Sequence, residues 1–203
     1  QARPPMDQLI FTDEAAIAGA PVPFLTINSV APTIMAFGTD EQKKEWVDDL
    51  AEGRKGFAFG ITEPNHGSDA THMETTAVRD GDEWIIEGQK VWTSTAQLTN
   101  LGMLLARTDP DRSKTHRGLS LFIVPKPVGD AHGFMFTQDG GGKMEGRPID
   151  TIGYRGMHSY EIALEDWWVP AENLIGLESG LGKGFYFQMA GFENGRLQTA
   201  ARA

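Results

Sequence analysis

The pattern of apolar residues changes from helical to strand-like after Arg54, and this change constrains the fold more than any other feature of the sequence. Before Arg54, apolar residues fall near helical spacing, with prolines dividing the segment. After it, short apolar runs alternate with turn residues, and Asp80-Gly81-Asp82 between two runs is a strong hairpin signal. A final helix is predicted over 185–203. We therefore expect an α+β fold in the order helix, strand, helix.

Seven runs are predicted to be strands, and their number and shortness favour a compact antiparallel barrel or sandwich. They span residues 56–61, 75–79, 83–93, 101–107, 118–124, 133–136 and 159–169. The glycine-rich segment 138–143 is expected to be an irregular, mobile loop. The clearest helix is predicted from Thr39 to about Glu52, because Thr39 and Gln42 have the spacing of a capping box and Gly53 is a suitable stop.

Composition excludes several classes of function. The net charge is -10, so no surface is available to neutralise nucleic-acid phosphates, and we expect no nucleic-acid partner. The absence of cysteine excludes disulfides and thiolate zinc sites. The five histidines lack the paired spacing of metal-binding helices, so no metal site is expected. No apolar run is long enough for a membrane span, and the chain is expected to be part of a longer protein.

Two polar segments follow predicted strands and carry the candidate chemistry. Residues 62–69, Thr-Glu-Pro-Asn-His-Gly-Ser-Asp, combine a rigid proline, a glycine that permits close approach and several hydrogen-bonding groups. In residues 88–94, Trp92 precedes Thr93 and Ser94, so a flat apolar face lies beside two hydroxyl groups, which suits a planar heteroaromatic ligand. Taken singly, the first segment is more typical of an ordinary polar turn, and the second of a core tryptophan beside a surface turn.

Taken together, and in this order, the segments resemble acyl-CoA dehydrogenases. The resemblance rests on residues 38–43, 59–69, 80–94, 153–156 and 164–176, which span nearly the whole chain. It implies a helical N-terminal domain over residues 1–54, a β-barrel middle domain that binds flavin and acyl-CoA over 55–175, and the beginning of a C-terminal helical domain over 176–203. Bound FAD is implied, with its ring between the middle domain and the C-terminal bundle.

The resemblance also implies roles for individual residues. Trp92 would pack on a face of the flavin, Thr93 and Ser94 would hydrogen-bond near its reactive nitrogen, and Gly67 would lie near the pyrophosphate. The full set implied to contact FAD is Phe59, Ile61, Thr62, Gly67, Ser68, Trp92, Thr93 and Ser94. The set implied to contact acyl-CoA is Ser68, Glu193 and Arg196, with a surface salt link as the alternative for the last two.

The catalytic base is not expected within these residues. In most relatives a glutamate that removes the α proton lies far into the C-terminal bundle, which corresponds to a position beyond Ala203. In a minority it lies at the position that aligns with Gly195, and a glycine cannot serve. Gly195 is instead expected to enlarge the acyl pocket. His66 replaces a small residue of the family pattern and is expected to cap its loop, with a titrating role as the alternative.

The expected activity is FAD-dependent dehydrogenation of an acyl-CoA to trans-2-enoyl-CoA. Two alternatives remain open: a flavin oxidase or monooxygenase of the same fold, and a non-catalytic subunit of a heteromeric dehydrogenase. The resemblance further implies an electron-transferring flavoprotein as acceptor and a homo-oligomer, either dimer or tetramer. A cytoplasmic location in a bacterium is favoured over the mitochondrial matrix.

Overall fold

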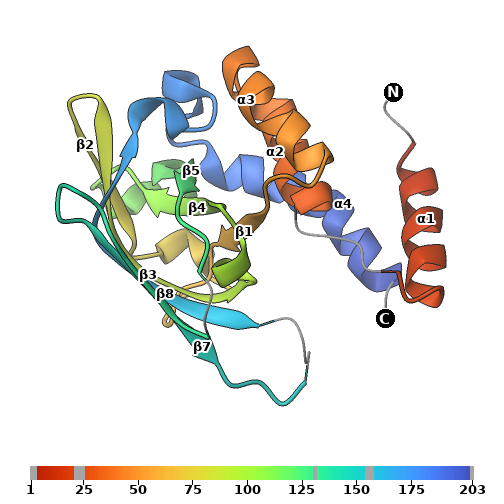
Figure 1. The fold of residues 1–203 in the computed structure, drawn as a ribbon. Coiled ribbons are helices and arrows are strands. Elements are labelled where there is room, and N and C mark those ends of the chain that lie inside the picture. The colour runs from red at the N-terminus through yellow and green to blue at the C-terminus, as the bar shows by residue number, and fades with distance from the viewer. Residues whose placement is uncertain (1–3, 21–25, 130–131, 154–157, 202–203) are drawn as a thin grey trace.

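The fold combines a mixed β-sheet with helices that gather on one side of it (Figure 1). The computed structural model describes residues 4–20, 26–129, 132–153 and 158–201. The expected α+β class and the order of helices, strands and helix are confirmed. Of the sequence segments discussed above, 154–156 lie outside the described residues.

Four α-helices are present, counted over the described ranges, and the third forms as its sequence predicts. They are α1 (Pro5–Ile17), α2 (Ala31–Phe37), α3 (Asp40–Ala51) and α4 (Gly184–Ala201), with a short π-helix (Thr26–Val30) before α2. At the start of α3, Gln42 N donates to Thr39 Oγ1 over 3.2 Å and Thr39 N donates to Gln42 Oε1 over 3.0 Å. This reciprocal capping box satisfies two backbone donors that the first helical turn leaves without partners. Gly53 follows the helix with a positive φ of 70°.

Gln42 also connects α3 to the end of the β domain. Its Nε2 donates to the carbonyl oxygens of Glu172 at 2.7 Å and Leu174 at 2.8 Å, and its Oε1 accepts from Gly176 N at 3.1 Å. The side chain is 4% exposed, so its polar atoms form hydrogen bonds with the protein in place of water. One capping residue thereby fixes the position of α3 against a segment about 130 residues later in the chain.

In the part of the chain that the structure describes, the sheet has eight strands in the order β1-β4-β2-β3-β8-β7-β6, with β5 paired to β4. The strands are β1 (Phe57–Gly60), β2 (Thr76–Asp80), β3 (Glu83–Ser94), β4 (Leu101–Arg107), β5 (Leu119–Pro125), β6 (Phe134–Thr137), β7 (Lys143–Ile149) and β8 (Ser159–Pro170). Most neighbours are antiparallel, but β1 and β2 both pair with β4 in parallel. The expectation of an antiparallel sheet was therefore wrong for the pairs β1–β4 and β2–β4. A hairpin makes neighbouring strands antiparallel, but no hairpin joins β1 or β2 to β4.

The segment 138–143 is more regular than its glycines suggested. Gln138 N donates to Gly142 O and Gly141 N donates to Gln138 O, both over 2.8 Å, which closes a hairpin turn between β6 and β7. The Gln138 side chain forms two hydrogen bonds with the backbone of Trp168 on β8: its Nε2 donates to Trp168 O, and its Oε1 accepts from Trp168 N. Residues 138–142 contain no helix or strand, as the prediction of a loop expected, but they form a hydrogen-bonded turn, and strand β7 after them was missed.

Strands β4 and β5 separate two hydrophobic clusters. Successive residues on a strand point to opposite faces. Leu104 and Phe122 therefore contribute to a cluster shared with β3, β7 and β8, whereas Met103 and Leu121 contribute to a second cluster shared with the helices. Both strands are buried on both faces, so they lack the alternation of polar and apolar residues that marks a half-exposed strand. The result is two strand layers covered by a helical layer.

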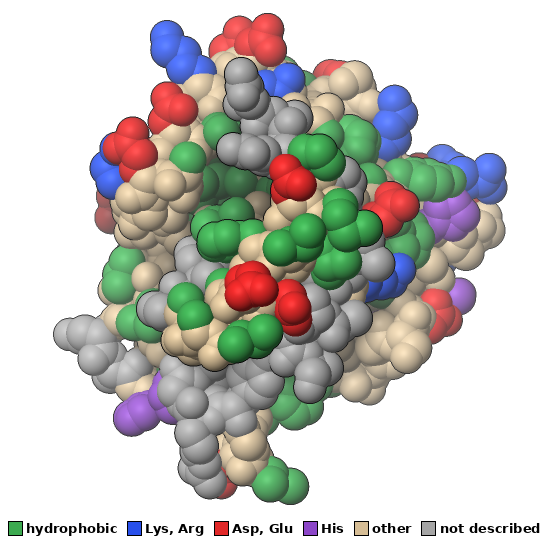
Figure 2. Space-filling view, turned by 90° about the vertical axis from the view of Figure 1, so that its right-hand side faces the viewer, with side chains coloured by type: hydrophobic (Ala, Val, Ile, Leu, Met, Phe, Trp, Pro, Cys, Tyr) green, Lys and Arg blue, Asp and Glu red, His purple; other side chains and the backbone are tan. Residues whose placement is uncertain are grey.

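Helix α4 packs closely on α2 and on the π-helix before it, and its glycines permit this. A Cβ atom at Gly191 would lie 2.3 Å from Thr33 Oγ1, and one at Gly195 would lie 3.3 Å from Ser29 Oγ. Helix α1 lies at the far end of α4 and exposes Met6, Ile10 and Phe11. Figure 2 shows apolar side chains gathered on this side of the molecule. A patch of this kind is typical of a contact surface.

Candidate functional site

A cleft of about 430 Å³ opens between the ends of β1 and β3 and helix α4. The side of the β domain contributes residues from β1, from the loop after it and from the end of β3: Phe59, Ile61, Thr62, Gly67, Ser68, Ala70, Trp92 and Ser94. Helix α4 contributes Phe185, Gln188, Met189, Phe192 and Arg196. The volume and the mixture of apolar walls with a few polar groups are those of a small-molecule site.

The structure brings together most of the residues that the sequence singled out. Seven of the eight residues expected at the flavin line this cleft: Phe59, Ile61, Thr62, Gly67, Ser68, Trp92 and Ser94. Arg196 also lines it, from α4. Thr93 and Glu193 do not, since the Thr93 side chain points into the β domain and Glu193 is exposed outside the cleft.

A β-bulge near the end of β3 turns Trp92 toward the cleft. The register between β3 and β8 shifts between Lys90 and Thr93, so β3 has one residue more than its partner. Trp92 occupies this bulge with φ of +61°, an uncommon backbone conformation for a bulky residue, and its side chain is 57% exposed. Local strain of this kind persists where the surroundings fix it, and it is concentrated at ligand sites. The bulge thus presents a flat aromatic face at the cleft.

The same bulge explains why Thr93 is absent from the cleft. A shift by one residue exchanges the two faces of a strand, so Thr93 takes the inward direction that Trp92 would otherwise have. Thr93 is 2% exposed and borders an internal cavity of about 20 Å³, large enough for about one water molecule. Its hydroxyl group has no hydrogen-bond partner among the described residues. The geometry therefore does not offer the Thr93 hydroxyl to a ligand in the cleft, whereas it does offer Ser94.

The loop after β1 is held by a buried ion pair. Lys90 Nζ lies 2.8 Å from Glu63 Oε1, and the two side chains are 0% and 3% exposed. Lys90 also donates to Ile61 O over 3.2 Å, while Glu63 accepts from the backbone N–H groups of Glu74 and of Thr75, the latter over 2.9 Å. Val91 N donates to Thr62 O over 2.8 Å. These contacts fix the segment 61–63 against the end of β3.

The pKa values of both members are lowered, but for different reasons. Burial lowers the pKa of Lys90 to about 8, although the nearby Glu63 carboxylate favours its charged form. Burial of Glu63 opposes its ionisation, but the charge of Lys90 and the hydrogen bonds to Glu63 outweigh it and hold the pKa of this carboxyl below its usual value. At neutral pH both groups are therefore charged.

Arg107, from the end of β4, supports the remainder of the same loop. Its guanidinium donates to Thr71 O over 2.8 Å and to Thr115 O over 3.4 Å, and its side chain is 4% exposed. Burial lowers the pKa of Arg107. A planar group with several donors suits this task, because it binds carbonyl oxygens from two loops at once. The cleft residues Gly67 and Ser68 thus lie in a loop anchored at both ends.

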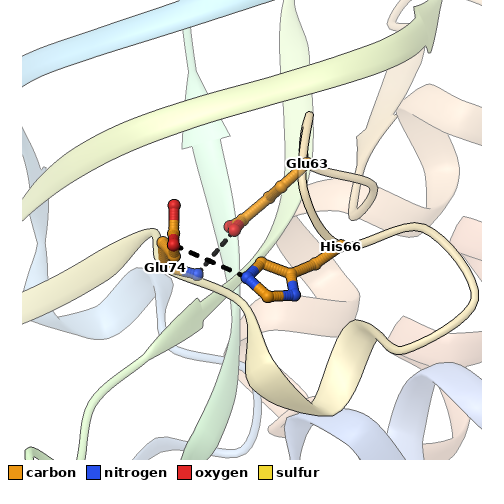
Figure 3. A group of neighbouring side chains, drawn as sticks. All are labelled: Glu63, His66 and Glu74. Carbon is orange, nitrogen blue, oxygen red and sulfur yellow. Dashed lines mark hydrogen bonds and ion pairs between the residues drawn. The ribbon is translucent and has the colours of Figure 1, made fainter.

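Glu63, His66 and Glu74 form a cluster whose potential ligand atoms lie within 4.8 Å of one another (Figure 3). His66 Nε2 lies 3.6 Å from Glu74 Oε1, and His66 exchanges two backbone hydrogen bonds of 3.1 Å with Glu63. The backbone of His66 thus closes the loop. The carboxylate of Glu63 is already used by Lys90 and by backbone N–H groups, and the ammonium group would repel a cation. The geometry therefore does not favour a metal ion here.

The wall formed by α4 was largely missed from the sequence. Phe185, Gln188, Met189, Phe192 and Arg196 recur at helical spacing, and this stripe is the signal that could have found them. The rings of Phe192 and Phe59, which both line the cleft, pack against each other with their centroids 5.3 Å apart. The expectation that Gly195 enlarges the pocket was wrong, because a side chain there would point toward Ser29 and not into the cleft.

Among the helices of the described ranges, none has the length and apolar character that a membrane span requires.

Comparison with known proteins identifies the family. The sequence model described as "acyl-CoA dehydrogenase, middle domain" matches residues 58–167, and that described as the N-terminal domain of the same family matches residues 2–54. Acyl-CoA dehydrogenase FadE26 of Mycobacterium tuberculosis is 49% identical over 181 residues, which cover 88% of this chain and 42% of that protein. The (2S)-methylsuccinyl-CoA dehydrogenase of Cereibacter sphaeroides is 44% identical over 174 residues, 85% of this chain and 30% of that protein.

Solved structures agree with this assignment. The Tcur3481-Tcur3483 steroid ACAD has a TM-score of 0.83 and 36% identity, covering 98% of this chain and 47% of that one. The ChsE4-ChsE5 complex from Mycobacterium tuberculosis has a TM-score of 0.78 and 42% identity, covering 95% and 45%. The chain spans less than half the length of each of these relatives. It belongs to the acyl-CoA dehydrogenase family, whose members are flavoprotein oxidoreductases.

Proposed function

We propose that this chain provides the flavin site and part of the substrate site of an enzyme that dehydrogenates acyl-CoA thioesters to trans-2-enoyl-CoA. The observation that carries the proposal is the cleft, where the exposed ring of Trp92 lies beside Ser94 and Thr62 and faces α4. The proposed domain division is 1–54, 55–175 and 176–203.

The residues of the cleft fit FAD. A planar isoalloxazine ring needs a flat apolar face and donors at its polar edge, and Trp92, Ser94 and Thr62 offer both from one side. The loop glycine Gly67 lines the cleft, and a Cβ atom there would meet no atom of the described residues within 4 Å, so a bulky cofactor group has room to approach. The fit therefore rests on the shape and the donor set of the site.

The residues of this chain would position the reaction. FAD, when bound, supplies a hydride acceptor for the β carbon of the thioester. Trp92 and Phe192 would exclude water and hold the ring and the acyl chain in alignment, while the hydroxyl groups of Ser94 and Thr62 would stabilise charge on the reduced ring. Ser68 and Arg196, both in the cleft, would bind the CoA portion. The glutamate that removes the α proton is proposed to come from outside these 203 residues.

The assembly is proposed to contain more than one chain, with an electron-transferring flavoprotein as acceptor. A dimer or tetramer of identical chains is the first proposal. A heteromeric dehydrogenase is the second candidate, because two structural neighbours are named as pairs, ChsE4-ChsE5 and Tcur3481-Tcur3483. In that case this chain is proposed to be the subunit without a catalytic base, and Gly195 is consistent with that role. A bacterial cytoplasmic location is proposed, as FadE26 is a bacterial protein.

A dye-reduction assay tests the proposed activity. The complete protein, alone and co-expressed with the product of any adjacent dehydrogenase gene, is supplied with straight-chain, branched and steroid acyl-CoA thioesters and an artificial electron acceptor. We expect acceptor reduction with at least one class, and a 2-enoyl-CoA product by mass spectrometry. Activity that needs oxygen and releases hydrogen peroxide would instead support a flavin oxidase. Activity only in the co-expressed pair would support the heteromeric enzyme.

A further inference from the structure

Gln188 is a buried polar side chain in the otherwise apolar part of the cleft wall. It is 4% exposed and lies on α4 among Phe185, Met189 and Phe192, which all line the cleft with it. Its carboxamide oxygen is fully buried and has no hydrogen-bond partner among the described residues. Buried amide groups are nearly always hydrogen-bonded, so an unpaired one at the wall of a ligand site indicates a partner that the ligand supplies.

The location of Gln188 separates it from the groups proposed to bind the flavin. Thr62 and Ser94 lie on the β domain, whereas Gln188 belongs to the opposite, helical wall. Its near neighbours on that wall are two phenylalanines and a methionine, and Phe59 faces them from β1. A single amide in such surroundings gains little from a hydrocarbon chain and more from a neutral group that can hydrogen-bond.

We propose that Gln188 is a specificity-determining residue that hydrogen-bonds an uncharged oxygen, either ketone or hydroxyl, in the acyl part of the substrate. This proposal rests on the proposed function, and it names the substrate class as acyl-CoA thioesters with such an oxygen beyond the β carbon. The carboxamide has both donor and acceptor atoms, and rotation of the amide exchanges them. A ketone would therefore accept from Nε2, and a hydroxyl could also donate to Oε1. A site built around such a bond discriminates strongly against the analogue without it.

The test compares matched ligands and matched variants of the complete protein. Octanoyl-CoA and a set of its mono-oxo and mono-hydroxy derivatives are used as substrates, and their 2-enoyl-CoA products are titrated calorimetrically because the products bind without turnover. In the wild type, the best oxygenated ligand is expected to bind about tenfold to a hundredfold more tightly than its hydrocarbon counterpart. The variant Q188L is expected to abolish this difference and to bind the hydrocarbon ligand at least as well.

Gln97 provides the matched control. It is also a buried glutamine whose oxygen has no partner among the described residues, but it does not line the cleft. The variant Q97L therefore makes the same change outside the site and is expected to keep the preference for oxygenated ligands. The variant Q188E, which has no N–H donor when ionised, is expected to lose ketone binding more than hydroxyl binding.

Three outcomes would overturn the proposal. Equal affinity of the wild type for oxygenated and hydrocarbon ligands would mean that Gln188 does not discriminate between them. An equal loss for all ligands in Q188L would assign Gln188 to the CoA portion that they share. Loss of FAD from Q188L, seen as a fall in flavin absorbance per mole of protein, would assign it to the cofactor. If no acyl-CoA reduces the wild-type flavin, the proposed function fails, and the calorimetric preference still reports on Gln188 separately.

Discussion

Replacing Lys90 with methionine is predicted to destabilise the protein by about 3 kcal/mol or more, because the change leaves a buried carboxylate without its counter-ion. Glu63 is 3% exposed and its oxygen lies 2.8 Å from Lys90 Nζ, so the pair is shielded from water. The backbone N–H groups of Glu74 and Thr75 still bind Glu63 in the variant, which places the loss toward the lower end of the range for a broken buried pair, about 3–5 kcal/mol.

A double variant separates the pair from the packing around it. Lys90→Met combined with Glu63→Gln removes both charges, so more than about half of the lost stability is expected to return. Lys143→Met is the control, because Lys143 forms an ion pair of 3.5 Å with Glu165 in which both side chains are more than half exposed. Surface pairs of this kind contribute about 0–1 kcal/mol.

Thermal unfolding of the three variants, followed by circular dichroism at constant pH and salt, provides the measurement. The single variant at Lys90 is expected to lower Tm by at least about 5 °C, and the control by less than about 2 °C. The loop tied by Glu63 carries Gly67 and Ser68, so flavin content per mole of protein is also expected to fall in the single variant. A change at Lys90 no larger than the control, or a double variant no more stable than Lys90→Met alone, would refute the reasoning.

Three further predictions concern the scaffold. Thr39→Ala removes the cap of α3 and is expected to cost about 1 kcal/mol in a urea titration. Gly191→Ala would place a Cβ atom 2.3 Å from Thr33 Oγ1 and is expected to cost about 1–3 kcal/mol, while Gly153→Ala, whose Cβ atom would have no atom of the described residues within 4 Å, should change stability by less than about 0.5 kcal/mol. Burial lowers the pKa of Lys126 from 10.5 to about 8. Between pH 8 and pH 10.5 the unfolded chain therefore keeps a proton on Lys126 that the folded chain has released. The free energy of unfolding contributed by this group should rise with pH in this range. Unfolding measured from pH 8 to 10.5 should therefore show a smaller upward slope in Lys126→Met, and an unchanged slope would contradict the assignment.

The local signals in the sequence predicted the local structure well. The capping box at Thr39 and the Asp80-Gly81-Asp82 turn depend on residues a few positions apart, and each formed as expected. Strand β7 was missed because glycines precede it and Pro148 lies within it, so the usual strand composition is lacking. The parallel pairing of β1 with β4 depends on which strands meet in space, and no short-range pattern specifies that.

At the site, the outcome at Trp92 and Thr93 shows why pattern alone was insufficient. Buried positions on β3 alternate through Trp84, Ile86 and Lys90, which would direct Trp92 inward. The bulge reverses this alternation, so Trp92 faces the cleft and Thr93 faces the interior. The partnership of Lys90 with Glu63 joins residues 27 positions apart. The one signal for it in the sequence is a lysine at an inward position of an apolar strand.

The most direct test of the central claim is an anaerobic absorbance titration of the complete protein with acyl-CoA thioesters. It is made on the wild type, on the variant Ser94→Val and on the matched control variant Thr93→Val. If the cleft holds a flavin that acyl-CoA reduces, the purified protein shows flavin absorbance that is bleached by at least one thioester. Ser94→Val, whose hydroxyl borders the cleft, should then shift the spectrum or slow the bleaching more than Thr93→Val, whose hydroxyl faces the interior. A protein that neither contains nor takes up FAD, or a larger spectral effect from Thr93→Val, would contradict the account.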